Sequence, residues 1–245
     1  NAFENCKSLE EIIIPETVTT IGYSAFYNCT ALTMVDLPEG LTSITNGMLR
    51  HSGITSIVIP ESVTNIAPYA FANCEDLKDV TFPSTAPEGM ISAFEGCTSL
   101  ESIELPQGMD SIPGGMFRNA GVRELAIPEG VKSIGNGSFR DNPNLEKLEV
   151  PASVTKIYGT DNFSGSDKLT VYCWWDSCVR EYCEKYDIPY VTFDEPPATE
   201  PPEPTEPEPT QPEPTQPLPT EPEPTQPAPT EPEPTQPEPT EPEPD

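Results

Sequence analysis

The feature that most constrains this chain is a repeat of 22–23 residues that runs through its first two-thirds. One proline recurs at the same phase of each unit, at Pro15, Pro38, Pro60, Pro83, Pro106, Pro128 and Pro151. An aromatic residue, once replaced by leucine, follows each proline at Phe26, Leu49, Phe71, Phe94, Phe117, Phe139 and Phe163, and Phe3 keeps the same phase. A unit of this length is too short to enclose a core alone, so the units are expected to stack into a solenoid.

Two apolar patterns flank each proline. The pattern L-x-x-I-x-I precedes it, as in Leu100-Ile103-Leu105, and its alternation predicts a strand that the proline ends because proline has no N–H to donate. A second apolar pair follows, as in Val63 and Ile66. The 22-residue units lose one residue in the turn, at Ser52-Gly53 and Ala120-Gly121, where glycine permits a shorter path.

One unit departs from these patterns. Ala86 and Gly89 stand where the other units have valine, leucine or methionine followed by isoleucine. We expect an irregular second strand there, with Met90 or Ile91 filling the core through a shift of register. A harmless local bulge is the simpler interpretation, and a kink that forms a binding site is the alternative.

The combined unit, L-x-x-I-x-I-P-x-x-V-x-x-I-G-x-x-A-F-x-x-C, resembles the BspA-like, or Treponema pallidum-type, leucine-rich repeat. The likeness covers roughly residues 1–173, over eight consecutive units. It implies a mainly β leucine-rich-repeat solenoid, coiled as a right-handed superhelix, on a bacterial surface protein. Some relatives of this family bind host matrix proteins or other bacteria. The period by itself predicts only a solenoid.

The repeat ends before a segment with a different pattern. Residues 169–173 and 188–193 are predicted strands, and between them one helix face carries Trp175, Cys178, Val179, Tyr182, Cys183 and Tyr186. We therefore expect repeats over residues 1–167, a strand–helix–strand cap over 168–194 and a linker over 195–245. Because Phe3 lies in mid-repeat, further units are expected upstream.

Residues 195–245 differ from the rest in composition. They hold 21 of the 33 prolines and 14 of the 41 acidic residues, with no lysine or arginine, and consist from Thr205 of eight T-[EQ]-P-x-P pentads. This composition predicts a disordered polyproline II spacer. A PxxP ligand is the alternative, but no cation flanks any copy. The segment resembles linkers of Gram-positive surface proteins, so an anchor or partner module would follow Asp245.

Charge and residue usage exclude several functions. With 12 basic against 41 acidic residues, the chain is unsuited to nucleic acid or anionic membrane. No apolar run approaches the ~20 residues of a spanning helix, so no membrane insertion is expected.

The few residues with reactive side chains have structural interpretations. The one histidine, His51, stands in a column of Asn, Asp and Gly that predicts a left-handed turn residue rather than a catalyst. Cys6, Cys29, Cys74 and Cys97 alternate with Ser, Ala and Asn in a column of small side chains, which favours a buried turn over a metal site. We expect no catalysis, no cofactor, no metal and a monomer.

The remaining candidate site is the exposed face of the strands. Its residues are Val58, Thr81, Glu101, Glu104, Arg123, Glu146, Lys147 and Glu149. This face predicts a binding module for protein or glycan on a host or bacterial surface, located outside the cell on the bacterial surface or wall. A passive solvated face is the alternative, in which the solenoid is an architectural spacer or accessory domain linked by the tail to an enzyme, dockerin or anchor module.

A chain that ends at Asp194 tests the linker assignment. Because residues 195–245 lack the apolar side chains needed to pack, their removal should shift the melting temperature by no more than about 2 °C. Thermal unfolding followed by circular dichroism measures this. A markedly lower melting temperature, or precipitation, would show that the tail belongs to the fold.

Overall fold

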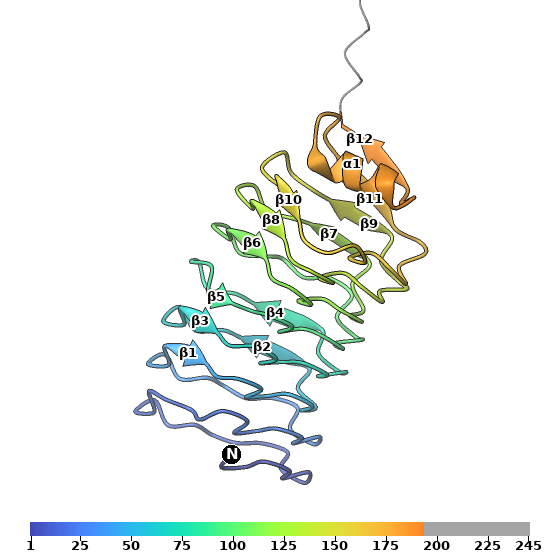
Figure 1. Cartoon of the computed structure of the whole chain (residues 1–245). Coiled ribbons are helices and arrows are strands. Elements are labelled where there is room, and N and C mark those ends of the chain that lie inside the picture. Colours follow the sequence, from blue (N-terminus) through green and yellow to red (C-terminus); the bar gives the residue numbers. More distant parts are fainter. Residues whose placement is uncertain (194–245) are drawn as a thin grey trace, which may run out of the picture. The chain divides into compact units, whose positions relative to one another are not determined.

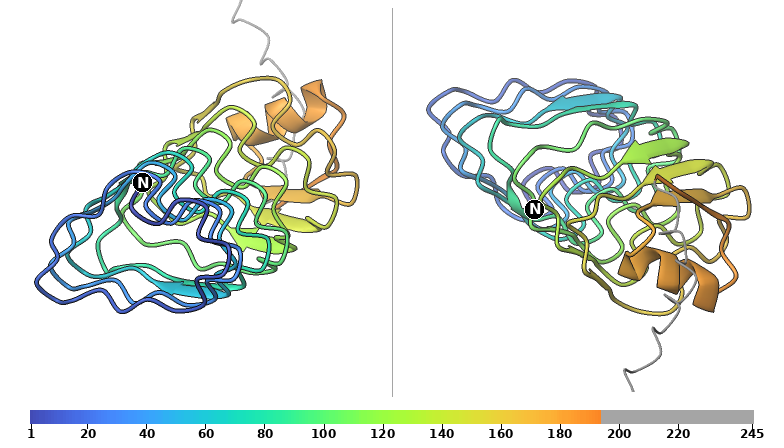
Figure 2. Two further views of the ribbon diagram at one scale, coloured as in Figure 1. Left: turned by 90° about the horizontal axis from the view of Figure 1, so that it is seen from below. Right: turned by 90° about the horizontal axis from the view of Figure 1, so that it is seen from above.

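The computed structural model describes residues 1–193, so the predicted linker lies outside the described part. The described residues form a parallel β-solenoid in which each repeat makes one turn (Figure 1). Seen along its length, the turns lie over one another with a progressive offset, and α1 lies at one end (Figure 2).

Two series of short strands run along the solenoid. The first comes from the L-x-x-I-x-I pattern and the cap, as β2 (Ser56–Val58), β4 (Asp79–Thr81), β7 (Glu124–Ala126), β9 (Lys147–Glu149), β11 (Thr170–Cys173) and β12 (Tyr190–Thr192). The second follows the prolines, as β1 (Ser43–Ile44), β3 (Asn65–Ile66), β5 (Glu88–Gly89), β6 (Ser111–Ile112), β8 (Ser133–Ile134) and β10 (Lys156–Ile157). All pairings are parallel and in register, so Ile57 lies beside Val80 and Leu125 beside Leu148.

Neither series is continuous. The sheets are β2-β4, β7-β9-β11-β12, β1-β3-β5 and β6-β8-β10, so both series are interrupted at the same place. The predicted strands at residues 9–14, 32–37 and 100–105 are absent, although Leu32 and Leu100 are fully buried. Apolar burial thus extends through units whose backbone ladder is incomplete.

The irregular unit was predicted in part. Met90 is 2% exposed and fills the core, whereas Ile91 is 48% exposed. The pairing register is unchanged, with Gly89 beside Ile66. Met90 instead turns inward because Gly89 and Met90 both have positive φ, +91° and +61°. A side chain at Gly89 would collide with the carbonyl oxygen of Ile66, so isoleucine does not fit this backbone.

Stacked phenylalanines form the part of the core that lies beside the turn with the left-handed residue, and we call this part of the solenoid the turn side. Phe71 and Phe94 are fully buried and their ring centroids lie 5.4 Å apart at 8°, which confirms the predicted column. The stack continues through Phe117, Phe139 and Phe163 with spacings of 5.8–6.0 Å. Leu49 takes the corresponding place between Phe26 and Phe71 and is also fully buried.

The turn beside this stack has a left-handed residue in each unit. Positive φ angles of 52–77° occur at Asn5, Asn28, His51, Asn73, Gly96, Asn119, Asp141 and Gly165. The turn assignment of His51 is therefore confirmed. The shorter units also behave as predicted, because a side chain at Gly53 or Gly121 would collide with the carbonyl oxygen of Thr30 or Thr98.

The cap closes the C-terminal end of the repeats. Helix α1 (Cys178–Lys185) begins three residues later than the apolar pattern suggested, because the Ser177 hydroxyl accepts a hydrogen bond from the Arg180 N–H (3.2 Å) and ends the preceding turn. Its buried face carries Val179, Tyr182 and Cys183. Tyr182 meets the last phenylalanine of the stack edge to face.

Truncation of one stacked ring tests this core. Phe71→Ala should lower the free energy of unfolding by ~3–5 kcal/mol, since it leaves a cavity among fully buried neighbours. Phe3→Ala is the matched control, because Phe3 is 38% exposed and should cost less than half as much. Chemical denaturation gives both values. A loss below ~1 kcal/mol for Phe71→Ala, or equal losses, would contradict the stacking.

Candidate functional site

The cysteine column is a structural hydrogen-bond ladder. In five places, a side chain of this column donates a hydrogen bond to the backbone carbonyl oxygen of the Phe or Leu in the preceding unit. These bonds run from Cys29 to Phe3 (3.0 Å), Cys74 to Leu49 (3.0 Å), Cys97 to Phe71 (3.2 Å), Asn142 to Phe117 (2.8 Å) and Ser166 to Phe139 (3.1 Å). Burial raises the pKa of the Cys74 thiol to about 12, which leaves a poor nucleophile. The prediction of small buried side chains is confirmed for Cys29, Cys74 and Cys97, whereas Cys6 in the first unit is exposed. Their donor role was missed, although cysteine, serine and asparagine share the ability to donate.

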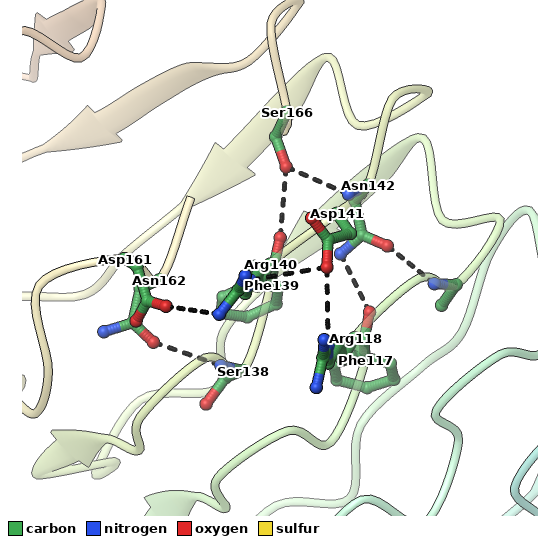
Figure 3. Close-up of polar contacts among 11 residues, drawn as sticks. Phe117, Arg118, Ser138, Phe139, Arg140, Asp141, Asn142, Asp161, Asn162 and Ser166 are labelled. Carbon is green, nitrogen blue, oxygen red and sulfur yellow. Dashed lines mark hydrogen bonds and ion pairs between the residues drawn. The ribbon is translucent and has the colours of Figure 1, made fainter. Parts of the chain in front are cut away.

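Polar side chains extend this ladder in the last units (Figure 3). Asn142 accepts from the Ala120 N–H at 2.7 Å, and Asn162 accepts from the Ser138 N–H at 3.1 Å. The Arg140 guanidinium pairs with Asp161 at 2.6 Å. Each of these contacts joins one unit to its neighbour, so the cluster holds the stack together.

His51 has no catalytic surroundings. Its ring meets Tyr27 edge to face at 5.6 Å. Burial lowers the pKa of His51, and nearby Arg50 lowers it further, so the imidazole is neutral at pH 7. Over residues 1–193, no three His, Cys, Asp or Glu side chains are grouped so that they could hold a metal ion. Within the same range, no helix has the length and apolar character to cross a membrane.

The structure divides the predicted binding face between two sheets. Val58 and Thr81 are register partners on β2 and β4. Lys147 and Glu149 lie on β9, with Glu146 just before them and Arg123 just before β7. Glu101 and Glu104 lie between the two sheets, in the segment that has no strand. The predicted flat, continuous face is therefore a surface interrupted at residues 101–105.

The two cations of this face are neutralised within it. The Arg123 guanidinium lies 3.3 Å from the Glu101 carboxylate, and the Lys147 ammonium lies 2.6 Å from that of Glu149. The hydrogen bond from Lys147 to Glu149 raises the pKa of Lys147. Among the described residues, Glu104 and Glu146 make no ion pair, so the face keeps a negative charge.

Sequence reasoning missed one residue of this face. Glu124 is exposed on β7, directly beside Lys147 in register, and makes no ion pair with any residue of the described range. Its position, one residue before the inward-facing Leu125, is exposed in the strands β2, β4 and β7. The alternation of the strand pattern could have identified it.

The comparisons with known proteins agree with this architecture. The family model described as "BspA type Leucine rich repeat region (6 copies)" matches residues 1–88 and 42–170. No curated protein gives a match.

Several solved structures resemble the chain, among them the following three. A leucine-rich repeat protein from Bacteroides ovatus is 30% identical over 70% of this chain and 51% of its own, with a TM-score of 0.55. The pneumococcal vaccine antigen PcpA is 19% identical over 74% of this chain and 55% of its own, with a TM-score of 0.50. A leucine rich cell surface protein from Faecalibacterium prausnitzii is 24% identical over 74% and 63%, with a TM-score of 0.39.

The chain thus spans about half the length of the first of these structures. The family model covers more than half of the chain, through the units whose strands, phenylalanine stack and turns are described above. The chain belongs to the BspA-type leucine-rich repeat family.

Proposed function

We propose that this chain is a binding module of a bacterial surface protein, which contacts protein or glycan through the exposed strand face. The proposal includes an extracellular location, a stalk formed by residues 195–245 and the absence of catalysis. Stacked repeats place chemically variable positions side by side on a rigid scaffold, and such extended surfaces are the usual binding sites of solenoids.

The size of the face supports this function. Exposed positions extend from Val58 on β2 to Glu146 beside β9, over turns of the solenoid that include the strandless segment at residues 101–105. A stable protein interface needs on the order of 800 Å² per partner, which a surface of several turns can supply.

The charge of the face supports a partner that is basic or of mixed charge, and it is the observation on which the proposal chiefly depends. Arg123 and Lys147 are paired inside the face, so the carboxylates of Glu104, Glu124 and Glu146 are the charges available to a partner. Acidic groups on an exposed surface increase the association rate of a cationic partner, and salt weakens this effect.

Charge reversal of the unpaired carboxylates tests the proposal. The triple variant Glu104→Lys, Glu124→Lys and Glu146→Lys should weaken binding to extracellular-matrix proteins or mucin by roughly tenfold at low salt, and less at 0.15 M salt. Reversal of Glu101 or Glu149 is a less clean test, because it would also break an existing ion pair. Surface plasmon resonance with the whole chain measures both conditions.

The matched control changes the same number of charges away from this face. Glu39→Lys, Glu75→Lys and Glu129→Lys alter exposed residues near the prolines and turns and should leave binding unchanged. Equal effects of the two triple variants would indicate a general charge effect. Absence of binding to every tested surface would contradict the adhesion proposal and favour the architectural role.

A further inference from the structure

Over residues 1–193, the strand-side backbone ladder is absent at two places, between residues 9–21 and 32–44 and between residues 77–91 and 100–113. We call the second place the inter-unit gap, and no backbone hydrogen bond joins residues 77–91 to residues 100–113. On the turn side the ladder is intact, with Ser92 N–H donating to Gly114 C=O (3.0 Å) and Phe94 N–H to Met116 C=O (3.0 Å). The turns are therefore joined along one side and parted along the strand side, where β6 and β7 begin new sheets (Figure 1).

The amino-acid sequence explains the gap. At equivalent positions, Ala67 N–H donates to Ile44 C=O (2.8 Å) and Gly135 N–H to Ile112 C=O (2.7 Å). The corresponding residue beyond the gap is Pro113, which has no N–H. The preceding unit departs at the same place, because Gly89 and Met90 both have positive φ and so leave the extended backbone that a ladder needs. The gap is thus encoded locally in two adjacent units.

Hollows border the gap on both sides of the core. One of about 230 Å³ lies between residues 86–90 and 108–113, and one of about 370 Å³ between residues 80–84 and 104–107. A third, of about 330 Å³, lies one unit further along the exposed strand face, between residues 102–104 and β7. Ile103 and Ala126 contribute apolar lining, Glu104, Glu124 and Glu149 contribute carboxylates, and Lys147 also lines the hollow.

The third hollow, which we call the β7 hollow, has a free strand edge as one wall. Among the described residues, strand β7 pairs with β9 on one side, and on the other side the chain is bonded only just before the strand, where Arg123 N–H donates to Glu101 C=O (3.0 Å). Ile127 N–H donates to Glu149 C=O on the β9 side, so alternation directs the backbone groups of Glu124 and Ala126 toward the hollow. An unpaired edge of this kind accepts an added strand.

We infer that the β7 hollow binds an extended polypeptide segment that carries lysine or arginine, and this inference rests on the proposed binding function of the same face. The segment pairs with the free edge of β7 through its backbone. A cationic side chain lays its methylenes over Ala126 and directs its charge to Glu104 and Glu124. Lys147 also lines the hollow but is paired with Glu149, and neither Glu104 nor Glu124 forms an ion pair within residues 1–193.

Short synthetic peptides test the backbone and charge requirements together. A fluorescent ten-residue peptide of alternating lysine and threonine should bind the whole chain, with fluorescence anisotropy as the measurement. A lysine–proline peptide of equal charge lacks N–H donors at half its positions and should bind at least about tenfold more weakly. A glutamate–threonine peptide should not bind. Equal affinity for the two lysine peptides would overturn strand pairing, and absence of binding by the lysine–threonine peptide would overturn the inference.

Filling the β7 hollow is the decisive variant. Ala126→Phe introduces a large side chain from an exposed position of β7 and retains every carboxylate of the hollow. This variant should lose lysine–threonine peptide binding by at least about tenfold. If it fails to fold, Ser102→Phe fills the hollow from the opposite wall and should give the same loss. Retained affinity in the folded variant would overturn the inference.

Removal of charge tests the assigned carboxylates. Glu104→Gln with Glu124→Gln should weaken the lysine–threonine peptide roughly threefold to tenfold. Glu10→Gln with Glu11→Gln, in an exposed segment of the first unit, is the control and should have no effect. If a matrix protein binds the whole chain while the lysine–threonine peptide does not, the proposed function of the face stands and the peptide site is refuted.

Discussion

The stacking of this solenoid depends on the turn side, where buried phenylalanines and a side-chain ladder set the distance between units. The rings of Phe71, Phe94, Phe117, Phe139 and Phe163 stack at 5.4–6.0 Å. Buried thiol, amide and hydroxyl groups satisfy backbone carbonyls of the same turns, which would otherwise lack partners in an apolar interior. Because this side is uninterrupted from Phe71 to Phe163, the strand side can lose its ladder locally without separating the stack.

This asymmetry explains how one chain contains both a continuous core and a discontinuous surface. Leu100, Leu105 and Met109 stay buried beside the gap, so apolar contact is kept where hydrogen bonds are lost. Backbone groups at a free edge on the surface are solvated, so they cost little when unpaired, whereas the same groups in the interior would be costly. A repeat protein can therefore place a local irregularity on its exposed face at small energetic cost, provided that the stacked phenylalanines and the hydrogen bonds of the turn side are continuous.

Much of this fold could be predicted from the sequence because each prediction relied on a local rule repeated eight times. The period, the phenylalanine column and the left-handed turn at His51 follow from spacing and from the residues that tolerate positive φ. The absent strand at residues 100–105 could not be predicted from its own pattern, which is regular. The equally regular patterns at residues 9–14 and 32–37 give no strand either, so the pattern of one segment does not decide whether neighbouring units form a ladder.

The binding face shows the same limit. The alternation of side chains along each strand predicts which residues are exposed. Whether the charge of an exposed residue is available to a partner depends on its contacts with neighbouring units. Arg123 and Lys147 are basic in the sequence, yet each is paired with a carboxylate of the same face. Arg123 is paired with a glutamate of the preceding unit, and Lys147 is paired with a glutamate of its own strand. The free charge then falls on Glu104 and Glu124, which meet at the edge of β7 because the ladder stops there. The irregularity that removes a strand from the sheet thus also concentrates unpaired carboxylates beside an unpaired backbone edge, and a basic extended segment would satisfy both.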